Sequence, residues 1–126
     1  MSTPAGVDEY IAGFPPDVAA RLTRIRSEIV TAVAAASGTV PEEKMRYGIA
    51  AVMLGGRHAL HFAGWKKHIG LYPVPTLPEP LESEIAPYRA EKDSVVFPHS
   101  QDVPYELIGR VARAIADGRV RQPTND

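Results

Sequence analysis

The clearest pattern in the chain is an apolar stripe at helical spacing between Pro16 and Ser37. Its members recur at intervals of three or four residues along one helix face: Val18, Leu22, Ile25, Ile29, Val33 and Ala36. Pro15 and Pro16 stand at its start, where a missing N–H removes no helical hydrogen bond. The pattern therefore predicts a long helix that ends at Ser37-Gly38.

Two further helices are predicted, one near each end of the chain. The first runs to Ala12, with acidic residues in its first turn and Gly13 closing it in a left-handed conformation. The second begins around Pro104 and ends before Gly118, and it has these apolar positions at helical spacing: Leu107, Ile108, Val111 and Ile115. Residues 118–126 are predicted to be a frayed tail, which leaves a core of about residues 7–117.

After the long helix the pattern changes to a period of two, which is typical of strands. In the first strand Met45 and Tyr47 would share one face, with Lys44 and Arg46 on the other. Gly48 then allows a bend or bulge before the next strand.

The following strands are predicted to form an antiparallel meander. The apolar run Ile49–Leu54 leads through Gly55-Gly56, a two-residue hairpin signal, into Arg57–Ala63. Gly64-Trp65 separates that strand from His68–Tyr72.

The next segment is rich in proline, which argues against long regular structure there. Leu81–Ile85 is predicted as a short helix, and Ser94–Phe97 as a further strand that ends at Pro98. This order of elements predicts an α+β fold: a mostly antiparallel sheet with helices packed on one face, in a single domain over residues 1–126.

Composition and charge narrow the classes of function. The net charge is −1, so no overall field draws the protein to nucleic acid or to an anionic membrane. Cysteine is absent, which excludes disulfide scaffolds, thiolate nucleophiles and Cys-ligated metal sites. No secretory signal pattern or apolar run of membrane-spanning length is present, and we expect a cytoplasmic protein.

The richest candidate site lies in the segment His61–Pro73, reading HFAGWKKHIGLYP. Strand alternation would turn His68 and Tyr72 to the face opposite Ile69 and Leu71. If helices cover the Ile69 side, a cationic row and a polar-aromatic row share the uncovered face. The candidate ligand-binding residues in and around these rows are Lys44, Arg46, Tyr47, Trp65, Lys66, Lys67, His68 and Tyr72. Arginine offers a two-pronged donor and lysine a point charge, which suits a carboxylate or phosphate. The alternative is that these cations only solubilise an exposed sheet face.

Catalytic and metal-binding patterns are weak. No serine lies in a Gly-x-Ser-x-Gly elbow and no phosphate-binding loop is present, so no catalytic residue is assigned. His58 and His61 are three residues apart, so they should face opposite sides of a strand, which disfavours a shared zinc site. Oxygen ligands for a metal would come from Glu79, Glu82 and Glu84.

Several motifs resemble those of one family of small bacterial domains of unknown function, the YdhG-like family. They are Val7-Asp8-Glu9-Tyr10-Ile11, Glu43-Lys44-Met45-Arg46-Tyr47-Gly48-Ile49, Lys66-Lys67-His68-Ile69-Gly70-Leu71-Tyr72-Pro73 and Pro104-Tyr105-Glu106-Leu107-Ile108. The resemblance implies a compact α+β domain. Some similar proteins are described as frataxin-like iron chaperones, which implies iron as an alternative ligand.

Three functions follow as hypotheses. The first is a non-catalytic domain that binds a small anion or carboxylate and needs no cofactor. The second, implied by the resemblance, is an intracellular iron chaperone. The third is a partner-binding module that exposes Trp65 and Phe62, because a large exposed aromatic residue commonly anchors an interface, here that of a homodimer.

Overall fold

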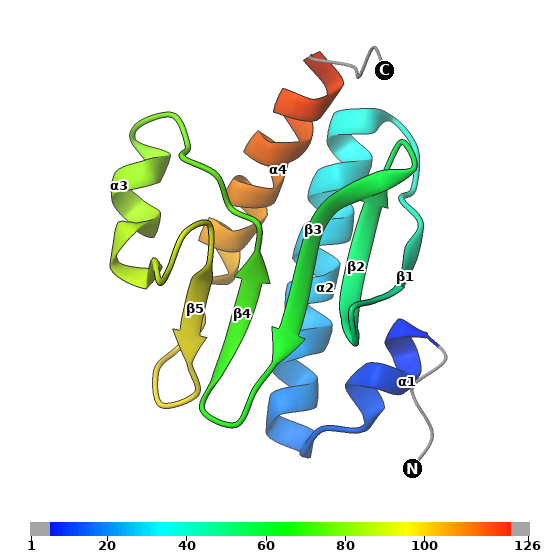
Figure 1. The fold of residues 1–126 in the computed structure, drawn as a ribbon, viewed down its shortest axis with the longest axis vertical. Coiled ribbons are helices and arrows are strands. Elements are labelled where there is room, and N and C mark those ends of the chain that lie inside the picture. Colours follow the sequence, from blue (N-terminus) through cyan, green and yellow to red (C-terminus); the bar gives the residue numbers. More distant parts are fainter. Residues whose placement is uncertain (1–5, 122–126) are drawn as a thin grey trace.

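The fold consists of one five-stranded antiparallel sheet with two long helices on one face (Figure 1). The structure is a computed structural model that describes residues 6–121. Its elements in chain order are α1 (Val7–Ala12), α2 (Pro16–Ser37), β1 (Glu43–Arg46), β2 (Ile49–Leu54), β3 (Arg57–Gly64), β4 (His68–Tyr72), α3 (Leu81–Ile85), a 3-10 turn (Ala86–Tyr88), β5 (Val95–Pro98) and α4 (Tyr105–Arg121). The predicted α+β fold with a meander of sequential strands is confirmed.

The helices follow the predicted apolar pattern, with two exceptions at their ends. In α2, Gly38 ends the helix at φ 83° and its N–H donates to the carbonyl of Ala34. The left-handed conformation predicted for Gly13 is wrong, because Gly13 has φ −78° and simply extends the last turn of α1. The predicted end of α4 before Gly118 is also wrong, since α4 continues to Arg121 and packs along α2, and tertiary packing outweighs the weak helix propensity of one glycine. The rest of the predicted tail, residues 122–126, lies outside the described residues.

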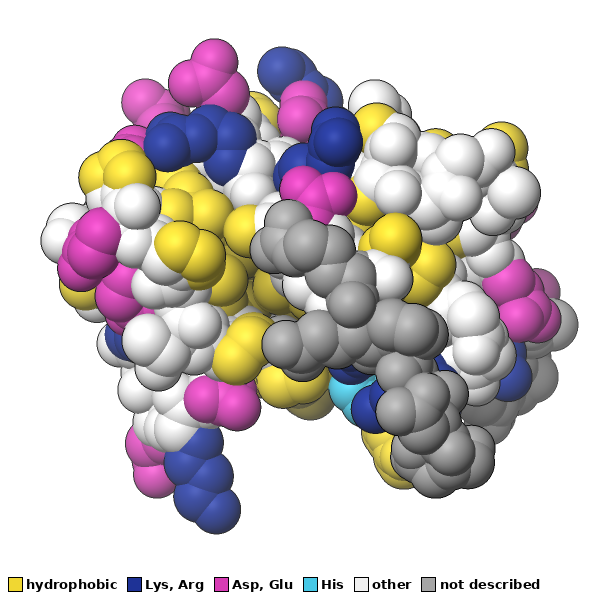
Figure 2. Space-filling model, turned by 90° about the horizontal axis from the view of Figure 1, so that it is seen from above, with side chains coloured by type: hydrophobic (Ala, Val, Ile, Leu, Met, Phe, Trp, Pro, Cys, Tyr) yellow, Lys and Arg dark blue, Asp and Glu magenta, His cyan; other side chains and the backbone are white. Residues whose placement is uncertain are grey.

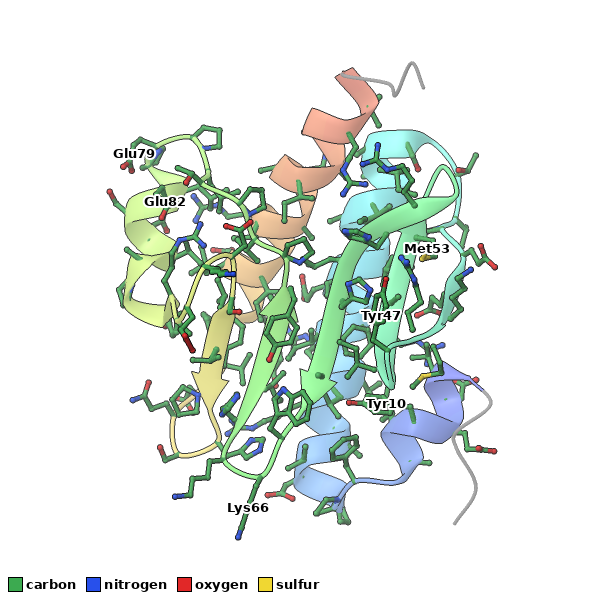
Figure 3. The ribbon with its side chains drawn as sticks, in the orientation of Figure 1. Tyr10, Tyr47, Met53, Lys66, Glu79 and Glu82 are labelled. Carbon is green, nitrogen blue, oxygen red and sulfur yellow. The ribbon has the colours of Figure 1, made fainter. Side chains whose placement is uncertain are left out.

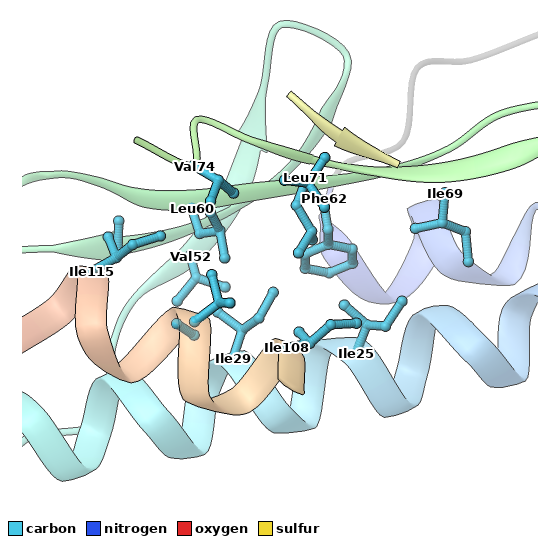
Figure 4. Packing of buried hydrophobic residues seen from close by; sticks show 14 of the residues in the cluster. Ile25, Ile29, Val52, Leu60, Phe62, Ile69, Leu71, Val74, Ile108 and Ile115 are labelled. Atoms are coloured by element: carbon cyan, nitrogen blue, oxygen red, sulfur yellow. The ribbon is translucent and has the colours of Figure 1, made fainter. Parts of the chain in front are cut away.

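The core lies between the sheet and the helix pair α2 and α4. Strand side chains such as Phe62 and Leu71 point toward Ile29 on α2 and Ile108 on α4 (Figure 4). The prediction that Ile69 and Leu71 face the helices is confirmed, since both are fully buried in this cluster. Within residues 6–121 no helix packs on the opposite face of the sheet, which we call the open face (Figure 1).

Two-residue loops join β1 to β2 and β2 to β3. The predicted Gly55-Gly56 hairpin is confirmed, with Leu54 pairing Arg57 across it. The loop between β1 and β2 is Tyr47-Gly48, with φ of 55° and 77°, so the placement of Tyr47 inside a strand beside Met45 is wrong. Two positive φ values in sequence suit the right-handed twist of a hairpin, and this turn chemistry favours glycine or asparagine rather than tyrosine.

Within the described residues, no helix combines the length and the apolar character that crossing a bilayer requires.

Candidate functional site

The open face is built from a row of paired residues that crosses four strands. Lys44 pairs Ala51, Ala51 pairs His61, and His61 pairs Tyr72, so these side chains share the face turned away from the helices. Lys44 is exposed at the edge strand, whereas His61 at the centre is only 6% exposed. The row therefore places a buried imidazole in the middle of a sheet face that no described helix covers.

A β-bulge brings a second histidine onto this face. Val52 pairs Leu60, but the next residue of β2, Met53, pairs His58, so Ala59 is the extra residue on β3. The bulge reverses the alternation, and the rings of His58 and His61 lie 5.0 Å apart between centroids. The prediction that these histidines face opposite sides is therefore wrong, because the rule of alternation assumes an unbroken ladder.

Arg46 joins this pair from β1. Its Nη1 lies 3.4 Å from His58 Nδ1, and its Nη2 donates to the hydroxyl of Tyr47 at 3.2 Å. A guanidinium has only donors, so His58 Nδ1 accepts and the imidazole is neutral with its proton on Nε2. Burial lowers the pKa of His58, and the neighbouring His61 and the cations Arg119, Arg46 and Arg57 lower it further.

His61 has an unsatisfied nitrogen at the floor of the cluster. Its Nδ1 lies 3.2 Å from the carbonyl oxygen of Tyr72, which fixes Nδ1–H as the donor and leaves a lone pair on Nε2. Nε2 is buried and has no hydrogen-bond partner among the described residues. Burial lowers the pKa of His61, although the Tyr72 carbonyl opposes this, so the ring stays neutral and Nε2 stays an acceptor.

Tyr47 lies over this floor at the turn between β1 and β2 (Figure 3). Its ring centroid is 5.9 Å from that of His61 and 5.1 Å from the guanidinium carbon of Arg46. The residue has a positive φ of 55° and is 82% exposed. A bulky residue held in this conformation stores strain, and such strain is typical of functional positions.

The charge of Arg46 is not neutralised by any described carboxylate. Five other arginines form ion pairs with aspartate or glutamate: Arg24, Arg26, Arg89, Arg110 and Arg113. Among the described residues no such pair involves Arg46, whose hydrogen-bond partners are a neutral imidazole and a phenol. We call Arg46, Tyr47, His58 and His61 the Arg46 cluster.

A second group of aromatic residues, Trp65 and Tyr72, lies along β4. Trp65 donates from Nε1 to the hydroxyl of Tyr72 at 2.9 Å, and Trp65 remains 47% exposed. The ring of Tyr72 lies back along its own strand over Gly70, where an added Cβ would come within 1.9 Å of the hydroxyl. Gly70 is therefore required for this ring position.

Comparison with known proteins gives a structural match and no sequence match. No model of a protein family matches the sequence, and no curated protein matches it. The structure resembles the crystal structure of a DUF1801 family protein, YdhG, from Bacillus subtilis, with a TM-score of 0.70. The fold is YdhG-like. Sequence identity is 19% over 93% of each chain, so the likeness confirms the expected fold and carries no function.

This fold brings together only some of the eight predicted ligand-binding residues. Arg46 and Tyr47 meet beside the two histidines on the open face, and Tyr72 meets Trp65. Lys44 is exposed on the same face, at the edge strand β1. The remaining residues of β4 and its turn lie apart from the cluster: Lys66 and Lys67 are exposed in the turn after β3, and His68 pairs with Pro98 next to it. Figure 3 shows Lys66 projecting away from the sheet at this end. His58 and His61 were not among the eight predicted ligand-binding residues, although the candidate segment begins at His61. Spacing alone could not find His58, because the bulge that turns it to this face breaks the alternation.

The predicted acidic metal site is not assembled in this YdhG-like fold. Glu82 accepts two hydrogen bonds from Arg89, and Glu84 accepts two from Arg110, while Glu79 accepts from Ser83. Within residues 6–121 no three histidine or acidic side chains lie close enough to hold a metal ion. The physical reason is that the glutamates of α3 point to different arginine partners instead of converging.

Proposed function

We propose that the Arg46 cluster binds a small anion, such as a carboxylate or a phosphate, on the open face of the sheet. The single observation that carries this proposal is an arginine whose described partners are all neutral, in the same cluster as a buried histidine nitrogen that has no hydrogen-bond partner. A guanidinium has five N–H donors, and the described contacts use two of them, so donors remain for a ligand.

The cluster also favours a particular kind of anion. Arg46 donates, whereas the lone pair on His61 Nε2 accepts, so the complementary ligand is negative and also has a hydroxyl or acidic O–H. A hydroxycarboxylate or a hydrogen phosphate has both groups, and a plain carboxylate has only the first. Tyr47 lies beside His61 and donates no charge to the cluster, but its phenol holds Arg46 in place for the ligand.

Thermal unfolding with added ligand tests this proposal. Glycolate and phosphate should raise the unfolding temperature of the parent protein more than acetate does, at equal ionic strength. Arg46→Ala should abolish these shifts. The matched control is Arg113→Ala, because Arg113 is an exposed arginine on α4 whose partner is Asp117. Equal shifts in the parent and in Arg46→Ala would overturn the proposal.

Partner binding is a second candidate, supported by the exposure of two aromatic residues on one face. Tyr47 is 82% exposed and Trp65 is 47% exposed, and large exposed aromatic residues commonly anchor interfaces. The expected exposure of Phe62 is wrong, because its side chain is fully buried in the core under the helices. Light scattering of the parent and of Trp65→Ser tests a homodimer. A dimer that Trp65→Ser dissociates supports this candidate, and a monomer at all concentrations removes the homodimer.

A further inference from the structure

A cleft lies at the opposite end of the sheet from the Trp65 turn, on the side where the helices pack. It has a volume of about 480 Å³, within the roughly 300–1,000 Å³ typical of ligand pockets. Its walls are the beginning of β3, the proline-rich segment after β4 and the last turns of α4. Viewed from above, hydrophobic side chains lie in a hollow at this end of the molecule (Figure 2).

Most of the cleft wall is apolar. The apolar lining residues are Ala59, Pro73, Pro75, Leu77, Pro78, Ala114 and Ile115. Thr76 and Asp93 also line the cleft, and the charge of Asp93 acts on Arg89. Prolines have no N–H, so this wall offers few donors to water or to a polar ligand. Ala59, the extra residue of the bulge, is only 1% exposed and forms part of the floor. Such a wall favours the hydrocarbon part of a ligand.

Two arginines stand at one side of the same cleft. Arg57 begins β3 and Arg119 comes from the last turn of α4. Arg119 donates from Nη1 to the carbonyl oxygen of His58 at 2.6 Å, which holds its guanidinium at the cleft. Burial lowers the pKa of Arg119, and the charge of Arg57 lowers it further. An anion bound at Arg119 would oppose both effects, because its negative charge stabilises the charged guanidinium.

We infer that this cleft binds a small amphipathic carboxylate, with its carboxylate at the guanidinium of Arg119 and its hydrocarbon chain against the proline and Ile115 wall. Arg119 provides a planar fork that matches a carboxylate, and the hydrogen bond to the His58 carbonyl orients that fork before binding. The inference does not depend on the open-face proposal, because none of its lining residues belongs to the Arg46 cluster.

Gly118 permits a variant that blocks the cleft without removing a contact. It lines the cleft within α4, and an added Cβ there would meet no atom within 4 Å. Gly118→Leu therefore fills the cleft, and it should leave the fold intact because leucine favours a helix more than glycine does. Arg119→Gln removes the charge and keeps a donor for the His58 carbonyl.

The probe is hexanoate, with hexan-1-ol as the uncharged comparison, and binding is followed by the NMR shifts of the Ile115 and Leu77 methyl groups. Hexanoate should shift these signals and should bind about tenfold more tightly than hexan-1-ol. Gly118→Leu should abolish binding, and Arg119→Gln should weaken it about tenfold. Arg46→Ala should leave hexanoate binding unchanged.

Three results would overturn the inference. The first is equal binding of hexanoate and hexan-1-ol, and the second is unchanged binding to Gly118→Leu. The third is loss of hexanoate binding in Arg46→Ala, which would place the ligand on the open face. Because glycolate and phosphate report on the Arg46 cluster and hexanoate on the cleft, failure at one site is distinguishable from failure at the other.

Discussion

The imidazole rings of His58 and His61 lie 5.0 Å apart between their centroids, on the same face of one strand. Three residues of regular strand would place them on opposite faces. The extra residue Ala59 turns His58 to the same face as His61. As a result His58 contacts Arg46, and His61 lies against Tyr47. A single extra residue in β3 thus creates the cluster on which the proposed anion site depends, and it also lines the separate cleft behind the sheet.

The first prediction concerns pH. Both His58 and His61 have pKa values lowered from their ordinary value of 6.5, chiefly by burial. Below pH 6.5 the unfolded chain therefore binds more protons than the folded protein, so the free energy of unfolding falls as the pH drops toward the folded pKa values. Thermal unfolding between pH 7.5 and pH 5 should show this loss, and His61→Gln should show a smaller one.

The control for this pH effect is His68→Gln, because His68 lies near the turn after β3 and outside the cluster. Acidic groups change the free energy of unfolding in a lower range of pH. Arg89 lowers the pKa of Glu82 from 4.5 to about 2, so the stability linked to Glu82 is lost only below pH 4.5. A pH dependence between 5 and 7.5 that His61→Gln leaves unchanged would contradict the assignment to His61.

The second prediction concerns Gly70. Gly70→Ala should displace the ring of Tyr72 and break its hydrogen bond with Trp65, since the new Cβ would come within 1.9 Å of the Tyr72 hydroxyl. We expect a loss of about 1–3 kcal/mol in the free energy of unfolding, measured in urea, with a change in tryptophan fluorescence. In a Tyr72→Ala background the same substitution should cost much less. Equal costs in both backgrounds would show that the ring does not cause the strain.

The third prediction is a trade between stability and binding at Tyr47. Tyr47→Asn puts a residue that tolerates positive φ into the hairpin loop, directly before Gly48. We expect the free energy of unfolding to rise by about 0.5–1 kcal/mol. Anion affinity should fall, because the phenol that orients Arg46 is removed. Tyr47→Phe is the matched control, since it keeps the ring and the backbone strain. A destabilised Tyr47→Asn would mean that ring contacts outweigh the strain.

The fourth prediction compares two arginines that both bind glutamates of α3. Arg89 donates to Glu82 and also to the carbonyl oxygens of Val74 and Pro75, which fixes the proline-rich wall of the cleft. Its side chain is 19% exposed, whereas Arg110, the partner of Glu84, is 44% exposed. Arg89→Lys should therefore lower the urea midpoint more than Arg110→Lys, because a lysine cannot reproduce three simultaneous contacts and exposed pairs contribute little. Equal midpoints would show that the wall does not depend on Arg89.

Much of the fold was predictable because its information is local. The stripe on α2, the Gly55-Gly56 hairpin and the alternation of Ile69 and Leu71 all follow from spacing along the chain. The candidate site was predicted only in part. Arg46, Tyr47, Trp65 and Tyr72 do lie on the open face, while Lys66 and Lys67 lie in the turn beyond it.

The sequence by itself determined which faces of the helices and strands are apolar, and hence the order of the layers, because burial follows the fixed periods of the backbone. The tertiary structure alone decided the sites. The bulge at Ala59, the turn at Tyr47 and the approach of Arg119 to the start of β3 depend on how distant segments pack. The bulge and the turn interrupt the two-residue period of the strands, and the period does not predict the Arg119 contact. Contacts between residues far apart in the chain stabilise all three features.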